Sequence, residues 1–208
     1  MSEPASASEP ARGLVFVLSG PAGVGKDAVL ARLLERGVAL GRVVTAITRP
    51  PRPNEVEGRD YYFVSRQRFE TMVAAGELLE WAEYVGSPRG TPIWSLEATL
   101  RRGRDAILKI DVEGARQVRE RLPGAITIFL EPPSLETLLQ RMAVRGHDDA
   151  AEMQRRLERA EEELAVGPSY DYRVVNREGQ LEQAVDEVAS IVAAERARVP
   201  PRTVELGG

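Results

Sequence analysis

Short apolar runs alternate along most of this chain with segments whose apolar residues recur at helical spacing. A run that is apolar at every position is typical of a strand buried on both faces of a parallel sheet. The predicted strands are Leu14–Leu18, Val43–Ile47, Ala106–Ile110, Ile126–Leu130 and Tyr172–Val175. The predicted helices are Asp27–Arg36, Val112–Arg121, Leu135–Val144, Ala150–Leu164 and Leu181–Arg198. This alternation predicts an α/β fold with a mostly parallel sheet flanked by helices.

Residues 49–104 interrupt the alternation with aromatic side chains and short mixed elements. We therefore expect a substrate-binding domain inserted into the fold, and we place it at residues 44–104. The predicted core comprises residues 13–43, 105–137 and 158–198, and residues 138–157 form a separate helical segment. The two ends, residues 1–12 and 199–208, are rich in Pro and small residues, and we expect them to be flexible tails.

The composition excludes several classes of protein. The chain has 208 residues, no cysteine and a formal net charge of −4, which excludes a disulfide scaffold and argues against a general nucleic-acid coat. No apolar run is long enough for a membrane helix, and the first residues lack the apolar core of a secretory signal. We expect a cytoplasmic protein with neither nucleic acid nor membrane as a partner, and the composition does not identify protein partners.

A glycine-rich segment, GPAGVGK, follows the first predicted strand and precedes a predicted helix. Its spacing is that of a P-loop, whose inward-pointing N–H groups and helix N-terminus bind phosphates. The strand–loop–helix context favours this interpretation over a glycine-rich turn with an incidental lysine. The expected ATP-binding residues are Gly20, Pro21, Ala22, Gly23, Val24, Gly25, Lys26 and Asp27.

Two arginines lie three residues apart in the proline-stiffened segment TRPPRP, at Arg49 and Arg52. Such a segment can present two guanidinium groups to one phosphate at little ordering cost. Solvated surface arginines are the alternative interpretation.

Following a P-loop, the longer stretch ITRPPRPNEVEGRDYYFVS resembles the GMP-binding segment of guanylate kinases. Later stretches, among them ELLEWA, IDVEG and FLEPPSLETLLQRMAVRG, resemble the same family in the same order, over about residues 13–195.

The resemblance implies transfer of the γ-phosphoryl group of ATP to GMP with the help of Mg²⁺. Arg49, Arg52 and Tyr61 would bind the GMP phosphate, and Glu80 with Thr45 would bind guanine. A carboxylate can accept from N1–H and the 2-amino group of guanine together, a pattern that adenine does not offer. The GMP-binding positions implied are Thr45, Arg49, Arg52, Tyr61, Glu80, Arg89, Thr91 and Asp111.

Residues 138–157 resemble the lid of the family, which closes over ATP and brings arginines to the transferring phosphate. The catalytic residues implied are Lys26, Arg49, Arg141, Arg145 and Arg156. An exposed helix held by salt bridges is the alternative interpretation of this arginine- and glutamate-rich segment. His147, the only histidine, fits a polar residue at the tip of the lid better than a catalytic one.

The chain departs from the usual family residues at four positions. Asp27 and Ala28 replace hydroxyl residues, Lys109 replaces an acidic residue, and Arg89 replaces a phosphate-binding tyrosine. We hypothesise that Asp27 is a direct or water-bridged Mg²⁺ ligand and that Lys109 pairs with it when the metal is absent. The alternative is that the two side chains point apart.

Two other functions remain open on the sequence. A ribose 1,5-bisphosphate phosphokinase can carry the Gly-Lys-Asp ending of the P-loop, but it would not need Glu80. A guanylate-kinase-like binding module would keep the GMP site to grip phosphopeptides without catalysis, but it would not need Lys26 and the lid arginines.

Overall fold

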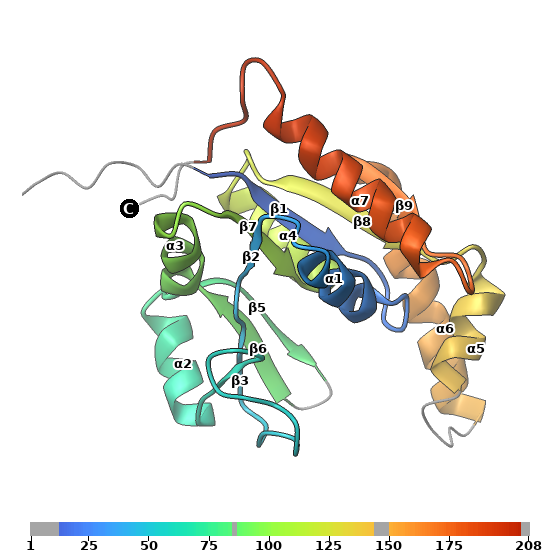
Figure 1. Cartoon of the computed structure of the whole chain (residues 1–208). Helices are drawn as coiled ribbons and strands as arrows, with labels where there is room; N and C mark the ends of the chain where they lie inside the picture. The colour runs from blue at the N-terminus through green and yellow to red at the C-terminus, as the bar shows by residue number, and fades with distance from the viewer. Residues whose placement is uncertain (1–12, 85–86, 144–149, 205–208) are drawn as a thin grey trace, which may run out of the picture.

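The computed structural model describes residues 13–84, 87–143 and 150–204, which form a layered α/β structure with a second, smaller sheet beside it (Figure 1). The larger sheet has five strands in the order β2-β7-β1-β8-β9, and every pairing within it is parallel. Its strands are β1 (Val15–Ser19), β2 (Leu40–Arg42), β7 (Asp105–Lys109), β8 (Ile126–Glu131) and β9 (Tyr172–Val175).

Strand β1 is buried at every position, as its uninterrupted apolar sequence predicts. Because side chains alternate along a strand, Phe16 and Leu18 pack into the core on one side of the sheet, and Val15 and Val17 pack on the other. The helices that pack on the first side are α1 (Lys26–Glu35), α5 (Leu135–Ala143), α6 (Ala150–Ala165) and α7 (Leu181–Arg196). Those on the second side are α3 (Ile93–Arg101) and α4 (Val112–Arg121).

The smaller sheet has the strand order β4-β3-β6-β5 and its own small core. Its strands are β3 (Ala46–Ile47), β4 (Tyr62–Phe63), β5 (Leu78–Tyr84) and β6 (Ser87–Pro92). Helix α2 (Arg66–Ala74) begins after Ser65, whose side chain accepts a hydrogen bond from the backbone N–H of Arg68. Phe69 and Met72 of this helix pack against the sheet.

The prediction of one strand over residues 43–47 is wrong. The chain leaves the large sheet after Arg42 and enters the small sheet at Ala46. Between them, the hydroxyl of Ser95 accepts from the backbone N–H of Val44 (3.1 Å) and donates to its carbonyl (3.0 Å). A side chain thus replaces the strand ladder here, and Thr45 lies between the two sheets.

The other predicted strands and helices are confirmed, with ends that shift by at most two residues. The sequence pattern did not predict β2, α2, α3, β4, β5 and β6. A short 3₁₀ turn, η1 (Gly167–Ser169), precedes β9. Within the parts of the chain described, no helix has the length and apolar character needed to span a membrane. Arg145 and His147 lie outside the described residues.

Candidate active site

A cavity of about 200 Å³ opens at the carboxyl edge of the parallel sheet, between the P-loop and the small sheet. Of the residues predicted from the sequence, those that line it are Ala22, Gly23, Lys26, Asp27, Thr45, Tyr61, Glu80, Arg89 and Asp111. The remaining lining residues are Arg42, Val43, Lys109, Ile110 and Glu163. Thr91 contacts Glu80 directly, whereas Arg49, Arg52, Arg141 and Arg156 do not line the cavity.

The P-loop runs from Gly20 to Lys26 and connects β1 to α1. Gly20, Gly23 and Gly25 have φ values of 141°, 80° and 103°, which side-chain-bearing residues rarely adopt. A Cβ on Gly20 would lie 2.1 Å from the carbonyl oxygen of Leu130, so this close approach to β8 requires glycine. Backbone freedom at these positions lets the loop curl around the space that a phosphate would fill.

Lys26 lies within the curl of the loop. Its Nζ donates to the carbonyl oxygens of Gly20 (2.6 Å) and Pro21 (3.0 Å). Burial lowers the pKa of Lys26 to about 8, and the Glu163 carboxylate partly offsets this effect. An anionic ligand in the cavity would favour the charged ammonium further.

Glu163 of α6 reaches the P-loop from a distant part of the sequence. Its Oε2 accepts from the backbone N–H of Ala22 (3.2 Å), and its Oε1 accepts from Nε of Arg159 (3.1 Å). The sequence analysis missed Glu163, because within a run of glutamates on a helix no pattern distinguishes the one that turns toward the loop.

On the opposite wall, Glu80 of β5 is 4% exposed and accepts from Oγ1 of Thr91 on β6 (2.6 Å). Burial raises the pKa of Glu80 to about 7; the Thr91 hydrogen bond opposes the rise and the nearby Asp111 carboxylate adds to it. Gly114 of α4 packs so closely that a Cβ there would lie 2.6 Å from Oε2 of Glu80. The carboxylate therefore has a fixed position in the wall.

Asp111 is the N-cap of α4 and accepts from the backbone N–H of Gly114 (2.8 Å). It also accepts from Nη2 of Arg89 (2.7 Å). Partial burial would raise the pKa of Asp111, but the Arg89 guanidinium outweighs it and holds that pKa below its ordinary value. This ion pair fixes both a cation and an anion at the junction of the two sheets.

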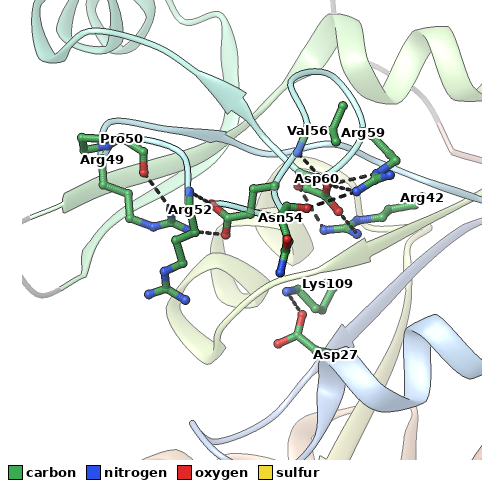
Figure 2. A network of polar contacts seen from close by, with 11 residues as sticks. Asp27, Arg42, Arg49, Pro50, Arg52, Asn54, Val56, Arg59, Asp60 and Lys109 are labelled. Carbon is green, nitrogen blue, oxygen red and sulfur yellow. Dashed lines mark hydrogen bonds and ion pairs between the residues drawn. The ribbon is translucent and has the colours of Figure 1, made fainter.

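The proline-stiffened loop carries a second fixed guanidinium. Arg49 donates through both terminal nitrogens to Glu55 (2.6 Å each) and lies 5.3 Å from the ring centroid of Tyr61. Glu55 also accepts from the backbone N–H of Arg52 (2.8 Å), and these contacts, that with Arg49 foremost, lower its pKa to about 2. Figure 2 shows Arg49 and Arg52 on this loop above the cavity residues Asp27 and Lys109.

The predicted lid arginines lie in different places. Arg141 of α5 donates to the carbonyl oxygens of Asn176 (3.0 Å) and Val24 (3.5 Å), so it supports the P-loop from behind. Asn176 Nδ2 also donates to the Val24 carbonyl (2.8 Å). Arg156 is partly exposed on α6.

The structure brings Asp27 and Lys109 into contact as an ion pair. Desolvation opposes ionisation of Asp27, but the Lys109 ammonium holds the pKa of Asp27 below its ordinary value. Arg42, which the sequence analysis missed, lines the same cavity and donates to the carbonyl of Asp60 (3.1 Å). A lone arginine at the end of a short strand carries no sequence signal of such a position.

A P-loop after a buried parallel strand, facing a second sheet with a buried carboxylate, is the arrangement expected of a P-loop phosphotransferase. Residues 12–195 match the family model described as guanylate kinase. The chain therefore belongs to the guanylate kinase family.

Similar proteins agree with this family. The chain is 46% identical to a guanylate kinase of Lactococcus lactis subsp. lactis (strain IL1403) over 188 residues, which covers 90% of this chain and 91% of that protein. It is 48% identical to a guanylate kinase of Thermus thermophilus over 187 residues, which covers 90% of this chain and 84% of that protein. A crystal structure of guanylate kinase from Anaplasma phagocytophilum has a TM-score of 0.71 at 33% identity and covers 89% of this chain and 87% of that chain.

The raised pKa of Glu80 predicts a pH-dependent stability difference. Because the folded pKa of about 7 exceeds the ordinary value of 4.5, ionisation of Glu80 costs stability; the cost grows as pH rises from about 4.5 to about 7 and levels off above that. We expect the free energy of unfolding of Glu80→Gln, relative to wild type, to increase by about 2 kcal/mol between pH 5 and pH 8. Urea unfolding at both pH values measures this, and a difference that does not change with pH would contradict the assignment.

Proposed function

We propose that this cavity carries out the reaction of its family, the transfer of the γ-phosphoryl group of ATP to GMP to give ADP and GDP. One observation supports the proposal most strongly: the P-loop lysine, Lys26, and the buried Glu80–Thr91 pair face the same cavity from opposite walls. The cavity thus offers a site for the ATP phosphates and a site for the GMP base, so both nucleotides can bind with their phosphates next to each other.

Glu80 would bind guanine in its ionised form, accepting from N1–H and the 2-amino group. Thr91 orients the carboxylate by donating to one oxygen, and Thr45 lines the cavity nearby. A buried acceptor left unpaired by a wrong base is costly, so this contact selects guanine over adenine.

The GMP phosphate would bind between the loop and the sheet junction. Tyr61 and Arg89 line the cavity, and Arg49 contacts the Tyr61 ring. Arg49 and Arg52 would supply guanidinium groups that grip phosphate with two parallel hydrogen bonds. Arg89, held by Asp111, offers a cation in place of the tyrosine usual in the family.

The ATP phosphates would lie in the P-loop, bound by backbone N–H groups such as that of Ala22 and by Lys26. A GMP phosphate oxygen forms a bond to the γ-phosphorus, and the bond from that phosphorus to the β–γ bridging oxygen breaks, leaving ADP. The step depends on positioning and charge neutralisation. We propose that Arg141, Arg145 and Arg156 contribute to that neutralisation from the lid at residues 138–157.

The donors near the P-loop fit a magnesium ion. Mg²⁺ in phosphotransferases is usually held by one or two carboxylates together with substrate phosphates, and Asp27 presents an exposed carboxylate beside Lys26. Among the described residues, no three or more His, Cys, Asp or Glu side chains lie together so that they could hold a metal ion. Asp27 would hold the ion, which when bound neutralises charge on the β- and γ-phosphates.

In this proposal the chain has three functional parts: a core, a GMP-binding insertion at residues 44–104 and the lid. We place the enzyme in purine nucleotide metabolism and in the cytoplasm, where its substrates are available. The intact P-loop around Lys26 favours a catalytic protein over a non-catalytic binding module. Glu80 argues against a sugar phosphate as the acceptor, because such an acceptor would not need it.

A comparison of acceptors tests the proposal. ADP release is measured with ATP and either GMP, AMP or ribose 1,5-bisphosphate. We expect release with GMP at least about a hundredfold faster than with AMP, as a site that pairs buried polar groups with its substrate discriminates strongly. Faster release with ribose 1,5-bisphosphate, or no release with any acceptor, would contradict the proposed function.

The tight packing of Gly114 gives a second prediction. Gly114→Ala should push the Glu80 carboxylate from its position and raise the KM for GMP about tenfold or more, equivalent to roughly 1.4 kcal/mol. The KM for ATP should stay within about twofold, because the P-loop lies on the other wall. Initial-rate kinetics for both substrates measure this, and equal changes in the two KM values would show a general loss of structure.

The loop arginines give a third prediction. Arg52→Lys keeps the charge but loses the two-pronged guanidinium, and we expect the KM for GMP to rise about tenfold. Arg66→Lys, on the exposed surface of α2, is the matched control and should leave that KM unchanged. A normal KM in Arg52→Lys would remove Arg52 from the phosphate site.

A further inference from the structure

The ion pair formed by Asp27 and Lys109 joins α1 to the end of β7 in the lining of the cavity. Asp27 is the second residue of α1, directly after Lys26, and Lys109 is the last residue of β7. Because β1 and β7 are adjacent and parallel, with Leu18 opposite Lys109, the P-loop and the end of β7 meet at the same edge. Figure 2 shows the two side chains directed toward each other.

The two partners are unequally exposed. The Asp27 side chain is 84% exposed, whereas that of Lys109 is 16% exposed. The carboxylate is thus open to solvent on its other side, while the lysine stem is held by the protein. An exchange of partners at Asp27 therefore leaves Lys109 within the cavity rather than in bulk water.

The surroundings of Lys109 carry charges of both signs. Lys26, Arg42 and Arg89 line the same cavity, together with Glu80, Asp111 and Glu163. Within the described residues, Asp27 is the carboxylate that forms an ion pair with Lys109, since Asp111 is paired with Arg89. Asp111 and Glu163 already accept from Arg89 and Arg159, so anionic phosphates at this junction would be the partners of a Lys109 ammonium released from Asp27.

The Asp27 carboxylate cannot bind a metal ion and keep its full ion pair with Lys109 at the same time. A divalent ion held by the same carboxylate competes with the ammonium for its charge. We propose that Asp27 exchanges Lys109 for the magnesium ion of ATP, and that the released Lys109 becomes a catalytic residue that contacts the phosphates between which the phosphoryl group moves. Lys109 keeps its proton throughout, and the bonds formed and broken are those of the phosphoryl transfer described above.

This inference rests on the proposed function. It predicts different effects for the loss of Asp27 and for the loss of Lys109. Asp27 acts through the metal, so its loss reduces the gain in nucleotide affinity that Mg²⁺ brings. Lys109 competes with the metal and later binds phosphate, so its loss increases that gain but lowers kcat. A merely structural pair would affect both quantities together.

The test measures binding and turnover on Asp27→Asn, Lys109→Gln and the double variant. Calorimetric titration of ADP, with Mg²⁺ and with a chelator, gives the gain in affinity due to the metal. We expect Asp27→Asn to reduce this gain about tenfold. Lys109→Gln should increase it severalfold, but not in the Asp27→Asn background, because the two effects share one carboxylate.

Turnover supplies the second readout. Lys109→Gln should lower kcat about a hundredfold, as loss of one contact to transition-state charge does, with little change in the KM for GMP. Lys109→Arg, which keeps a cation, should recover most of that kcat. Glu35→Gln on α1 and Arg101→Gln on α3, both highly exposed, are controls that should match wild type.

Two results would each overturn the inference: an unchanged metal-dependent gain in Asp27→Asn, or a wild-type kcat in Lys109→Gln. Failure of the proposed function is distinguishable, because it would appear as wild-type protein that binds Mg²⁺ and ADP but releases no ADP with GMP. Thermal melting of each variant separates these outcomes from loss of the fold.

Discussion

The parallel pairing of β7, β1 and β8 determines where the P-loop residues Lys26 and Asp27 lie relative to Lys109 and Asp111. Parallel strands deliver their carboxyl ends to one edge, so the P-loop after β1 and the segment after β7 lie side by side. The same sheet buries apolar side chains on both faces, and this burial provides the rigidity that holds the edge in place. Burial of apolar surface contributes roughly 25 cal/mol per Å², so the core offsets the cost of holding many charged groups close together at this edge.

The lining of the cavity contains four cationic side chains and four carboxylates, whose charges offset one another. Lys26, Arg42, Arg89 and Lys109 face Asp27, Glu80, Asp111 and Glu163 around one cavity. Several of these charges are already matched in pairs, which lets a basic phosphate site form in a chain whose net charge is −4. Under the proposed function, phosphates entering the cavity would replace protein carboxylates as partners of these cations, which the fold has already partly withdrawn from water.

Periodicity and loop chemistry predicted most of the fold. Continuous apolar runs identified buried strands, because burial on both faces leaves no polar position. The run at residues 43–47 was misleading for the same reason: Val43 and Val44 are buried, but an apolar run does not say which of two sheets buries it. The turn there depends on Ser95, a residue 51 positions away from Val44. Glu163 and Arg42 escaped prediction because their positions in the cavity come from packing between distant segments, which no local pattern encodes.

The chemistry of the basic residues has a practical consequence. Of 28 basic residues only Lys26 and Lys109 are lysines, and both line the cavity. Guanidinium groups stay protonated and do not react with acylating reagents at neutral pH, whereas with a pKa of about 8 about a tenth of the Lys26 amine is unprotonated at pH 7. Every side-chain primary amine of this chain therefore lines the candidate active-site cavity. Amine-directed labelling of side chains reports on that cavity alone, and under the proposed function bound nucleotide would protect both amines.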